Sequence, residues 1–238
     1  MDFNFISPSY KRADNCLTHK AYPSIKYAVC ETEAGAYKKN GIKNLIVLPK
    51  GIQGNNARVR NYILDNYNDN PLVMMDDDTM SIGIYDEGKR IKLNEQDLFD
   101  KITNHIQLMK DLGAYLGGVN LILEPRAYRI NCPYSFFTPI LGPFNIHIKS
   151  AVRYSEELNL KADYDYFLEQ IKTNKLTLRD NRMNYDHKKL TYKGGCAMLR
   201  NEAEERKQFD LFQKKWGVIV QVDKQSKEKF DINPKIRI

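Results

Sequence analysis

Short apolar runs alternate with amphipathic stretches over the first third of the chain. We predict strands at the apolar runs, which are bounded by polar or turn-forming residues, at residues 3–6, 25–30, 45–48 and 72–75. Between them we predict a helix or turn at residues 13–22 and helices at residues 33–40 and 57–66, with Gly41 capping the helix at 33–40. Strands that alternate with helices in this way are typical of a parallel sheet with crossover helices.

The rest of the chain contains longer helical periods and less regular apolar runs. We predict a hairpin at residues 83–88, strands at residues 118–123 and 218–222, and short mixed strands in the aromatic-rich and proline-rich stretch 127–149. Helices are predicted at residues 95–113, 163–173 and 201–216, the first of them capped by Asn94. The pattern predicts one α/β domain over residues 1–223, with a mostly parallel, mixed central sheet flanked by helices, and a loosely packed basic tail over residues 224–238.

Composition favours an ordered globular protein. The 238 residues are 42% hydrophobic and 28% charged, which is ordinary for a folded domain. The cysteines lie far apart without metal-ligand spacing, so free thiols in a reducing compartment explain Cys16, Cys30, Cys132 and Cys196. The amino terminus lacks a basic region followed by an apolar stretch, and no apolar run approaches the ~20 residues of a membrane span. We therefore expect a cytoplasmic protein, in the host cytoplasm if it is viral, with no membrane partner.

The charge balance is basic. Lys and Arg number 37 against 30 Asp and Glu, so the formal net charge is +7 and the chain tends to attract polyanions. Much of the excess lies in the carboxyl third, at Lys172, Lys175, Arg179, Arg182, Lys188, Lys189, Lys193, Arg200, Arg206, Lys207, Lys214 and Lys215. These residues are a candidate surface for the phosphate backbone of a nucleic acid, and a solubilising face without a ligand is the alternative.

Three consecutive aspartates, Asp76 to Asp78, directly follow the apolar run 71–75. A buried strand that ends in adjacent acids places their charges at the carboxyl end of a sheet, where open α/β folds bind ligands. Three neighbouring carboxylates repel one another unless a hard cation such as Mg²⁺ or Mn²⁺ supplies compensating charge. The acids therefore indicate a metal site. The alternative is a solvated acidic turn, because Asp-rich turns are common at strand ends.

Four short segments, in this order and spacing, resemble the GT-A class of nucleotide-sugar-dependent glycosyltransferases. They are Ile-Ser-Pro-Ser-Tyr-Lys-Arg at residues 6–12, Gly-Ile-Gln-Gly-Asn-Asn-Ala-Arg-Val-Arg-Asn at 51–61, the Asp-x-Asp signature at 76–78, and Ala-Asp-Tyr-Asp-Tyr-Phe-Leu at 162–168. Within this class the chain is most similar to phage and TET-associated glycosyltransferases, which are thought to decorate hydroxymethylated pyrimidines in DNA. Tyr-Lys-Gly-Gly-Cys at 192–196 supports this narrower resemblance. The resemblance covers most of residues 3–200 and departs at Ala162, where relatives often carry Glu.

The resemblance implies a nucleotide-sugar-binding half over residues 1–125 and an acceptor-binding half over residues 126–223. It implies a Mn²⁺ or Mg²⁺ site with Asp78 as the first ligand and Asp76 and His187 as further ligands, His187 coming from a loop that closes over the donor. The cation would stabilise the diphosphate leaving group. The residues implied to contact the nucleotide sugar, with a UDP-sugar favoured, are Ser7, Ser9, Tyr10, Lys11, Arg12, Arg60, Asn61, Asp76, Asp77, Gly194 and Gly195.

Two further choices concern pairs of residues on one helix. Arg58 and Arg60 cannot both face the donor, so we predict a site role for Arg60 and a surface role for Arg58. In an inverting reaction one carboxylate removes the proton of the acceptor hydroxyl, and Asp163 is the first candidate for this base. Asp165 is the second candidate, although residues i and i+2 of a helix point to different sides. The alternative for Asp163 is a helix cap.

The chain is thus predicted to be a metal-dependent glycosyltransferase. It would move a sugar to a hydroxyl of a hydroxymethylated pyrimidine in DNA, such as 5-hydroxymethylcytosine, as in the hypermodification of bacteriophage DNA. One alternative is the same chemistry on a glycan, lipid or protein acceptor, and another is a non-catalytic nucleic-acid-binding protein whose acids are structural. A two-metal nuclease or polymerase is disfavoured, because the chain lacks a second set of acids at metal-bridging spacing. The oligomeric state stays open.

Overall fold

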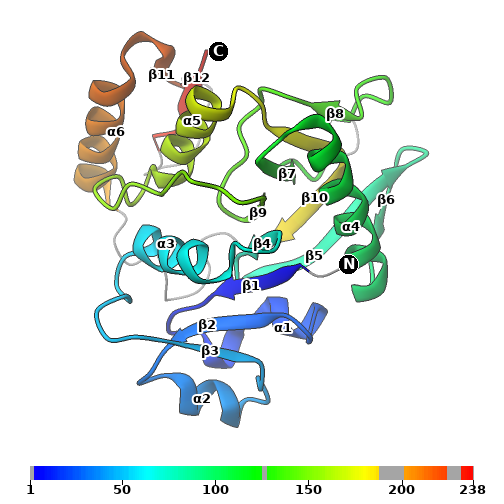
Figure 1. Ribbon diagram of the computed structural model, residues 1–238, viewed down its shortest axis with the longest axis vertical. Helices are drawn as coiled ribbons and strands as arrows, with labels where there is room; N and C mark the ends of the chain where they lie inside the picture. The colour runs from blue at the N-terminus through cyan, green and yellow to red at the C-terminus, as the bar shows by residue number, and fades with distance from the viewer. Residues whose placement is uncertain (1–2, 125–127, 188–200, 224–231, 238) are drawn as a thin grey trace.

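The computed structural model describes residues 3–124, 128–187, 201–223 and 232–237 (Figure 1). The strands in these ranges are β1 (Asn4–Pro8), β2 (Lys26–Cys30), β3 (Leu45–Leu48), β4 (Leu72–Met75), β5 (Thr79–Asp86), β6 (Lys89–Lys92), β7 (Leu116–Asn120), β8 (Tyr134–Ser135), β9 (Phe144–His147), β10 (Leu178–His187), β11 (Val220–Val222) and β12 (Pro234–Ile236). The α-helices are α1 (Leu17–Ala21), α2 (Ala34–Lys39), α3 (Asn56–Tyr67), α4 (Glu95–Leu112), α5 (Ala162–Asn174) and α6 (Glu202–Trp216).

One large sheet organises the molecule. Within the described ranges it has ten strands in the order β3-β2-β1-β4-β9-β7-β10-β5-β6, with β8 paired to β10. The first four strands of this order are parallel. β9 runs antiparallel to both β4 and β7, and β5 runs antiparallel to β10 and β6. The sheet is therefore mixed, with most strands in one direction, as the sequence predicted.

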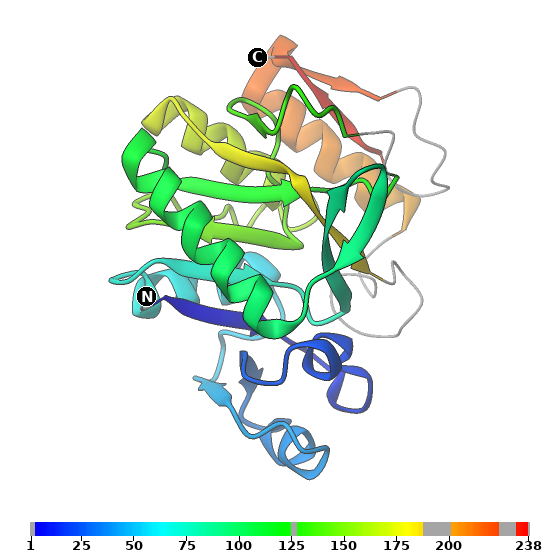
Figure 2. The ribbon, with the colours of Figure 1, turned by 90° about the vertical axis from the view of Figure 1, so that its right-hand side faces the viewer.

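Strand β4 shows why this sheet is covered on both faces. Its four residues are all buried. Val73 and Met75 pack in the core beneath α1, α2 and α4, whereas Leu72 and Met74 pack in the core beneath α3, α5 and α6. Successive side chains of a strand point to opposite faces, so a continuous apolar run fits a strand that is buried on both sides. Figure 2 shows α4 crossing one face of the sheet.

The helices and the parallel strands lie where they were predicted, with ends that shift by one or two residues. The side chain of Asn94 accepts a hydrogen bond from Asp97 N at the start of α4, and Gly113 ends the helix in the left-handed conformation at φ 72°. β7 begins at Leu116, slightly before the predicted strand at 118–123, and the predicted hairpin is longer, because β5 and β6 extend from both sides of the turn at residues 87–88. Cys16, Cys30 and Cys132 are free thiols, while Cys196 lies outside the described residues.

Strand β10 was not predicted, and its omission is the main error in the expected fold. Its sequence, Leu-Arg-Asp-Asn-Arg-Met-Asn-Tyr-Asp-His, is rich in Asp and Asn, which are depleted in strands. In the structure it pairs with β7 on one side and with β5 and β8 on the other. Asp180, Asn181 and Asn184 are buried there. Long-range pairing therefore outweighs the weak local preference of this segment.

The predicted tail is also partly wrong. Pro234–Ile236 forms β12, which pairs antiparallel with β11, and Ile232 and Ile236 pack against the core that contains α6. This end of the chain is therefore packed onto the domain, not loosely attached to it. Within the described ranges no helix is long and apolar enough to cross a membrane.

Candidate active site

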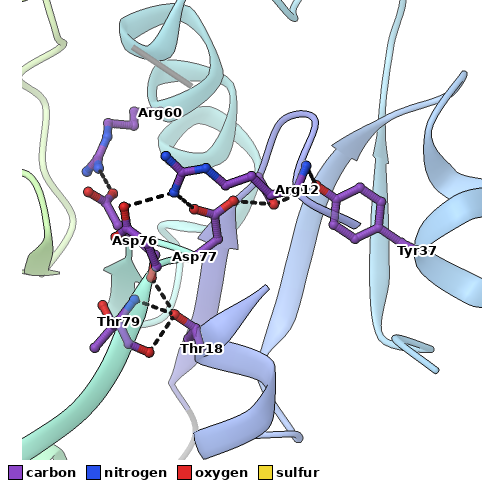
Figure 3. Close-up of polar contacts among 9 residues, drawn as sticks. Arg12, Thr18, Tyr37, Arg60, Asp76, Asp77 and Thr79 are labelled. Atoms are coloured by element: carbon purple, nitrogen blue, oxygen red, sulfur yellow. Dashed lines mark hydrogen bonds and ion pairs between the residues drawn. The ribbon is translucent and has the colours of Figure 1, made fainter. Parts of the chain in front are cut away.

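The three aspartates occupy the turn between β4 and β5, at the carboxyl end of β4. Thr18, from α1, holds the backbone of this turn: its hydroxyl donates to Asp76 O at 2.6 Å and accepts from Thr79 N at 3.0 Å. The amide of Thr18 donates to Asp77 O at 3.1 Å. The contacts of the Thr18 hydroxyl are visible in Figure 3. Thr18 was not singled out from the sequence, because its role depends on α1 lying beside a turn that is some sixty residues later.

Arg12 neutralises two of the acids. Its Nη1 lies 2.6 Å from Asp77 Oδ1 and 2.8 Å from Asp78 Oδ2 (Figure 3). The other oxygen of Asp77 accepts a short hydrogen bond from Ser9, whose hydroxyl lies 2.6 Å from Tyr37 OH. Burial raises the pKa of Asp77 to about 6, although Arg12 and Ser9 favour its charged form. Residues from the end of β1 thus meet the acids at the end of β4.

Arg60 binds the first acid from the opposite side. Its Nη2 lies 2.6 Å from Asp76 Oδ1 and donates to Gly142 O at 2.8 Å. The guanidinium is buried and lies 5.7 Å from the centre of the Tyr154 ring. Burial raises the pKa of Asp76 to about 7; Arg60 lowers it, and the neighbouring aspartates Asp77 and Asp78 raise it further. The predicted contact between Arg60 and Asp76 is present.

Asp163 lies in the first turn of α5, next to the same glycine. Its Oδ2 accepts from Gly142 N at 3.2 Å, and its Oδ1 accepts from Tyr164 N at 2.9 Å. The Gly142 residue therefore contacts Arg60 through its carbonyl and Asp163 through its amide. The structure thus links the acid turn of β4 to the start of α5 through one backbone residue.

Asp165 lies away from this cluster, which corrects its candidacy as a base. Its side chain is 1% exposed, and its Oδ1 accepts from Trp216 Nε1 and from Lys215 Nζ, both at 2.7 Å. The helical turn points Asp163 and Asp165 to different sides, so Asp165 instead fastens α5 to α6.

Tyr185 is a site residue that the sequence reasoning missed. It lies on β10, where burial raises the pKa of its phenol and the nearby carboxylates of Asp76, Asp163 and Asp78 raise it further. These three contributions indicate that Tyr185 lies in the neighbourhood of the acid turn and of Asp163. No sequence signal could have found it, because β10 itself was not predicted.

His187 is the last residue of β10 and pairs in register with Thr79, the residue after the acids. Its ring lies 4.8 Å from the ring of Tyr185. The expectation of a loop is wrong, since His187 belongs to a strand, but the strand brings it to the acid turn. Among the described residues no group of three or more His, Cys, Asp or Glu side chains is arranged to hold a metal ion.

The other residues that were predicted to contact the nucleotide sugar have different surroundings. Ser7 is buried in β1, whereas Lys11 is exposed, has φ 57° and places its ammonium 5.0 Å from the Tyr10 ring. Asn61 uses both ends of its amide on the backbone of Tyr154, at 2.7 and 2.9 Å, which favours a scaffolding role over direct contact with a donor. Gly194 and Gly195 lie outside the described residues.

Arg58 has the predicted surface role. It pairs with Glu156 at 2.8 Å, and both side chains are more than 40% exposed. Several of the basic residues of the carboxyl third also have acidic partners: Arg182 pairs with Asp180, Lys207 with Glu204, and Lys215 with Asp165 and Glu169. These pairs neutralise part of the surface that was predicted to attract nucleic acid.

Comparison with solved structures identifies the fold. The chain resembles a mycobacterial protein (11% identity, TM-score 0.54), covering 98% of this chain and 83% of that one. It also resembles glucosyl-3-phosphoglycerate synthase from Mycobacterium tuberculosis, solved with Mn²⁺, UDP-glucose and phosphoglyceric acid (9% identity, TM-score 0.52, 97% and 87% coverage). TarS from S. aureus is 14% identical with a TM-score of 0.49; the match covers 77% of this chain, which spans 60% of TarS. The fold is that of the GT-A glycosyltransferases.

The family follows from the sequence itself. The sequence model of the TET-associated glycosyltransferases matches residues 3–195. The chain therefore belongs to the TET-associated glycosyltransferase family, and its class is that of the glycosyltransferases. Comparison with curated protein sequences found no match.

Proposed function

We propose that this enzyme transfers a sugar from a UDP-sugar to the hydroxyl of a hydroxymethylated pyrimidine in DNA, in the modification of bacteriophage DNA. The observation that carries the proposal is the contact of Gly142 with both Arg60 and Asp163. It brings a half-buried carboxylate on the acceptor side next to the acids on the donor side. A glycosyl transfer needs this juxtaposition, because the acceptor hydroxyl must lose its proton close to the bond that breaks.

The proposed donor site lies at the ends of β1 and β4. Arg12 is a cation whose buried Nε has no hydrogen-bond partner in the part of the chain that the structure describes. A phosphate oxygen is a natural acceptor for such an N–H group. Ser9 and Tyr37 hold the segment that carries Arg12, since Tyr37 OH accepts from Arg12 N at 3.3 Å. Lys11 and Tyr10 are exposed or half-exposed at the same turn and are proposed to contact the nucleotide.

The proposed metal ligands are Asp78, Asp76 and His187. The carboxylate groups suit Mn²⁺ or Mg²⁺, and β10 brings His187 to the residue that follows the acids. A bound divalent cation would supply electrostatic stabilisation for the diphosphate leaving group. The protein's part is to hold Asp76 with Arg60 and to keep the acid turn in shape through Thr18.

The proposed base is Asp163. Within the described ranges its Oδ2 accepts one hydrogen bond, from the amide of Gly142, and a carboxylate oxygen keeps further acceptor capacity for an acceptor hydroxyl. A target base within a duplex would have to be flipped out of the stack to reach Asp163. The name of the family supports a DNA acceptor.

Mass spectrometry of nucleosides tests the proposed function. DNA containing 5-hydroxymethylcytosine would be incubated with the protein, Mn²⁺ and a panel of nucleotide sugars, then digested. We expect one donor to add a sugar mass to the modified nucleoside. Asp78→Ala should lose metal-dependent donor binding, and Asp111→Asn, at an exposed site on α4, is the matched control. Release of nucleoside diphosphate without any adduct on DNA would contradict the DNA acceptor and leave the transferase chemistry, on a glycan, lipid or protein acceptor.

A further inference from the structure

Arg12 occupies the place of a cation at the acid turn. A single nitrogen, Nη1, contacts carboxylate oxygens of both Asp77 and Asp78, at 2.6 and 2.8 Å. All three side chains are largely buried, with 12%, 7% and 16% of their surface exposed. In this shielded position the guanidinium compensates the negative charge that would otherwise require a metal ion.

The two acids that Arg12 contacts differ in how other residues hold them. Asp77 is also held through its second oxygen by Ser9, and it is the more buried of the two acids. Asp78 has no hydrogen bond or ion pair other than the one to Arg12 within the described ranges. The contact with Asp78 is therefore the one that can open while Asp77 keeps the arginine in place.

A divalent cation that binds Asp78 would meet the guanidinium at the same carboxylate. Like charges at hydrogen-bonding distance repel strongly where water is excluded, so the cation and Arg12 cannot both stay on that oxygen. The described residues also provide no ready group of three metal ligands. Metal binding at this turn thus needs further metal ligands from outside the described residues, and it needs another hydrogen-bond acceptor for Arg12.

A nucleoside diphosphate supplies both. Its phosphate oxygens can bind the cation, and they can accept hydrogen bonds from Arg12, whose Nε is buried without a partner in the described part of the chain. We propose that Arg12 is an exchangeable counter-ion: it neutralises Asp78 in the free enzyme and transfers to the diphosphate when the metal and nucleotide bind. This inference rests on the proposed metal-dependent function. It makes the free enzyme a weak binder of metal and couples metal binding to the nucleotide.

Manganese binding, measured by the EPR signal of free Mn²⁺, tests the exchange. Wild-type protein, Arg12→Gln and Arg12→Lys would be titrated with Mn²⁺ alone and with saturating UDP. We expect Arg12→Gln to bind Mn²⁺ alone at least tenfold more tightly than wild type, and UDP to enhance its Mn²⁺ affinity at least tenfold less. Arg153→Gln, which removes an arginine from the exposed pair with Asp65, is the matched control and should leave both affinities unchanged.

Two further variants keep the outcome decisive. The double variant with Arg12→Gln and Asp78→Asn should lose the additional Mn²⁺ affinity that Arg12→Gln has over wild type. This loss would show that the additional Mn²⁺ affinity depends on Asp78. Arg12→Lys retains a cation but lacks the planar fork, so its Mn²⁺ affinity should lie at least threefold above wild type even if Arg12→Gln does not fold. Unchanged or weaker Mn²⁺ binding by folded Arg12 variants, in a protein that binds Mn²⁺ with UDP, would overturn the exchange alone. Absence of Mn²⁺ binding under every condition would overturn the proposed metal site as well.

Discussion

The two halves of the sheet use their charged residues differently. In the parallel half, formed by β1 to β4, Arg12, Asp77 and Asp78 meet at the ends of neighbouring strands and pair with one another. In the other half of the sheet and the helices packed on it, two acids are committed to internal contacts. Lys161 and Glu205 form a pair that is almost fully buried, and Asp165 binds residues of α6. The comparison teaches that a charged residue close to a site in the sequence is a candidate site residue only if it is not already paired with residues of a neighbouring helix.

Asp163, unlike Asp165, remains the candidate for the catalytic base after this comparison. We expect Asp163→Asn to reduce kcat by about 10²–10⁴-fold, because a general base contributes that much to proton transfer. Binding of the UDP-sugar should change by less than twofold, since Asp163 contacts Gly142 and Tyr164 and not the acid turn itself. Single-turnover kinetics and calorimetric titration with donor measure the two effects. A variant with wild-type kcat would remove Asp163 from catalysis and leave the acceptor half without a base.

Arg60 joins the two halves, and its removal should damage both. Arg60→Met leaves Asp76 and the carbonyl of Gly142 without their donor. We expect the free energy of unfolding to fall by roughly 2–3 kcal/mol, below the cost for a fully buried pair, because the side chain of Asp76 is 34% exposed.

The control for Arg60 is Arg58→Met on the same helix, which breaks an exposed pair and should cost less than ~0.5 kcal/mol. Urea unfolding of both variants checks the difference. Equal losses of stability would mean that the junction at Gly142 adds nothing to the fold.

Asp165 sharpens the distinction between the two acids of α5. Asp165→Asn keeps the shape of the side chain but weakens its hydrogen bonds to Trp216 and Lys215. We expect a loss of about 1–3 kcal/mol in the free energy of unfolding, with kcat of the folded protein within twofold of wild type. Thermal unfolding and steady-state kinetics at low temperature separate these effects. A stable variant with kcat as low as that of Asp163→Asn would reverse the roles assigned here.

His147, on β9 at the seam between the halves, should have no effect at neutral pH and an effect that grows as the pH falls. Burial, and then Arg60 and Arg153, lower its pKa to about 3, so the folded state holds the neutral imidazole. The unfolded chain takes up a proton below pH ~6.5, and the folded chain does so only near pH 3. Unfolding therefore binds protons between these values, and stability falls as the pH falls, by up to ~1.4 kcal/mol per pH unit.

The measurement for His147 is urea unfolding at several pH values between 7 and 4. His147→Gln retains a donor and an acceptor for Tyr166 OH, which lies 3.0 Å from His147 Nδ1, but it does not titrate. We expect a shallower pH dependence in the variant than in wild type. Identical slopes would show that His147 does not contribute to acid sensitivity.

How much could be predicted from sequence follows the same division. The strands β1 to β4 and the helices were placed correctly because each has a local signal: a buried apolar run, a helical period or a cap such as Asn94. The acid turn and its contact with Arg60 were also expected. β10 was missed because its polar residues are held by partners far away in the chain, and Tyr185 was missed with it. Asp165 was a poor candidate for the base because its hydrogen-bond partner belongs to α6, about fifty residues later in the chain.

By itself, the sequence determined the alternation of strands and helices, the position of three aspartates at a strand end, and the family of the protein. Such properties depend on residues that are close in the chain. Only the tertiary structure decided that Arg12 lies between Asp77 and Asp78, that Gly142 bridges Arg60 and Asp163, and that Asp165 is buried against α6. The partner of a charged side chain depends on distance and burial in the folded chain, and local sequence patterns specify neither quantity.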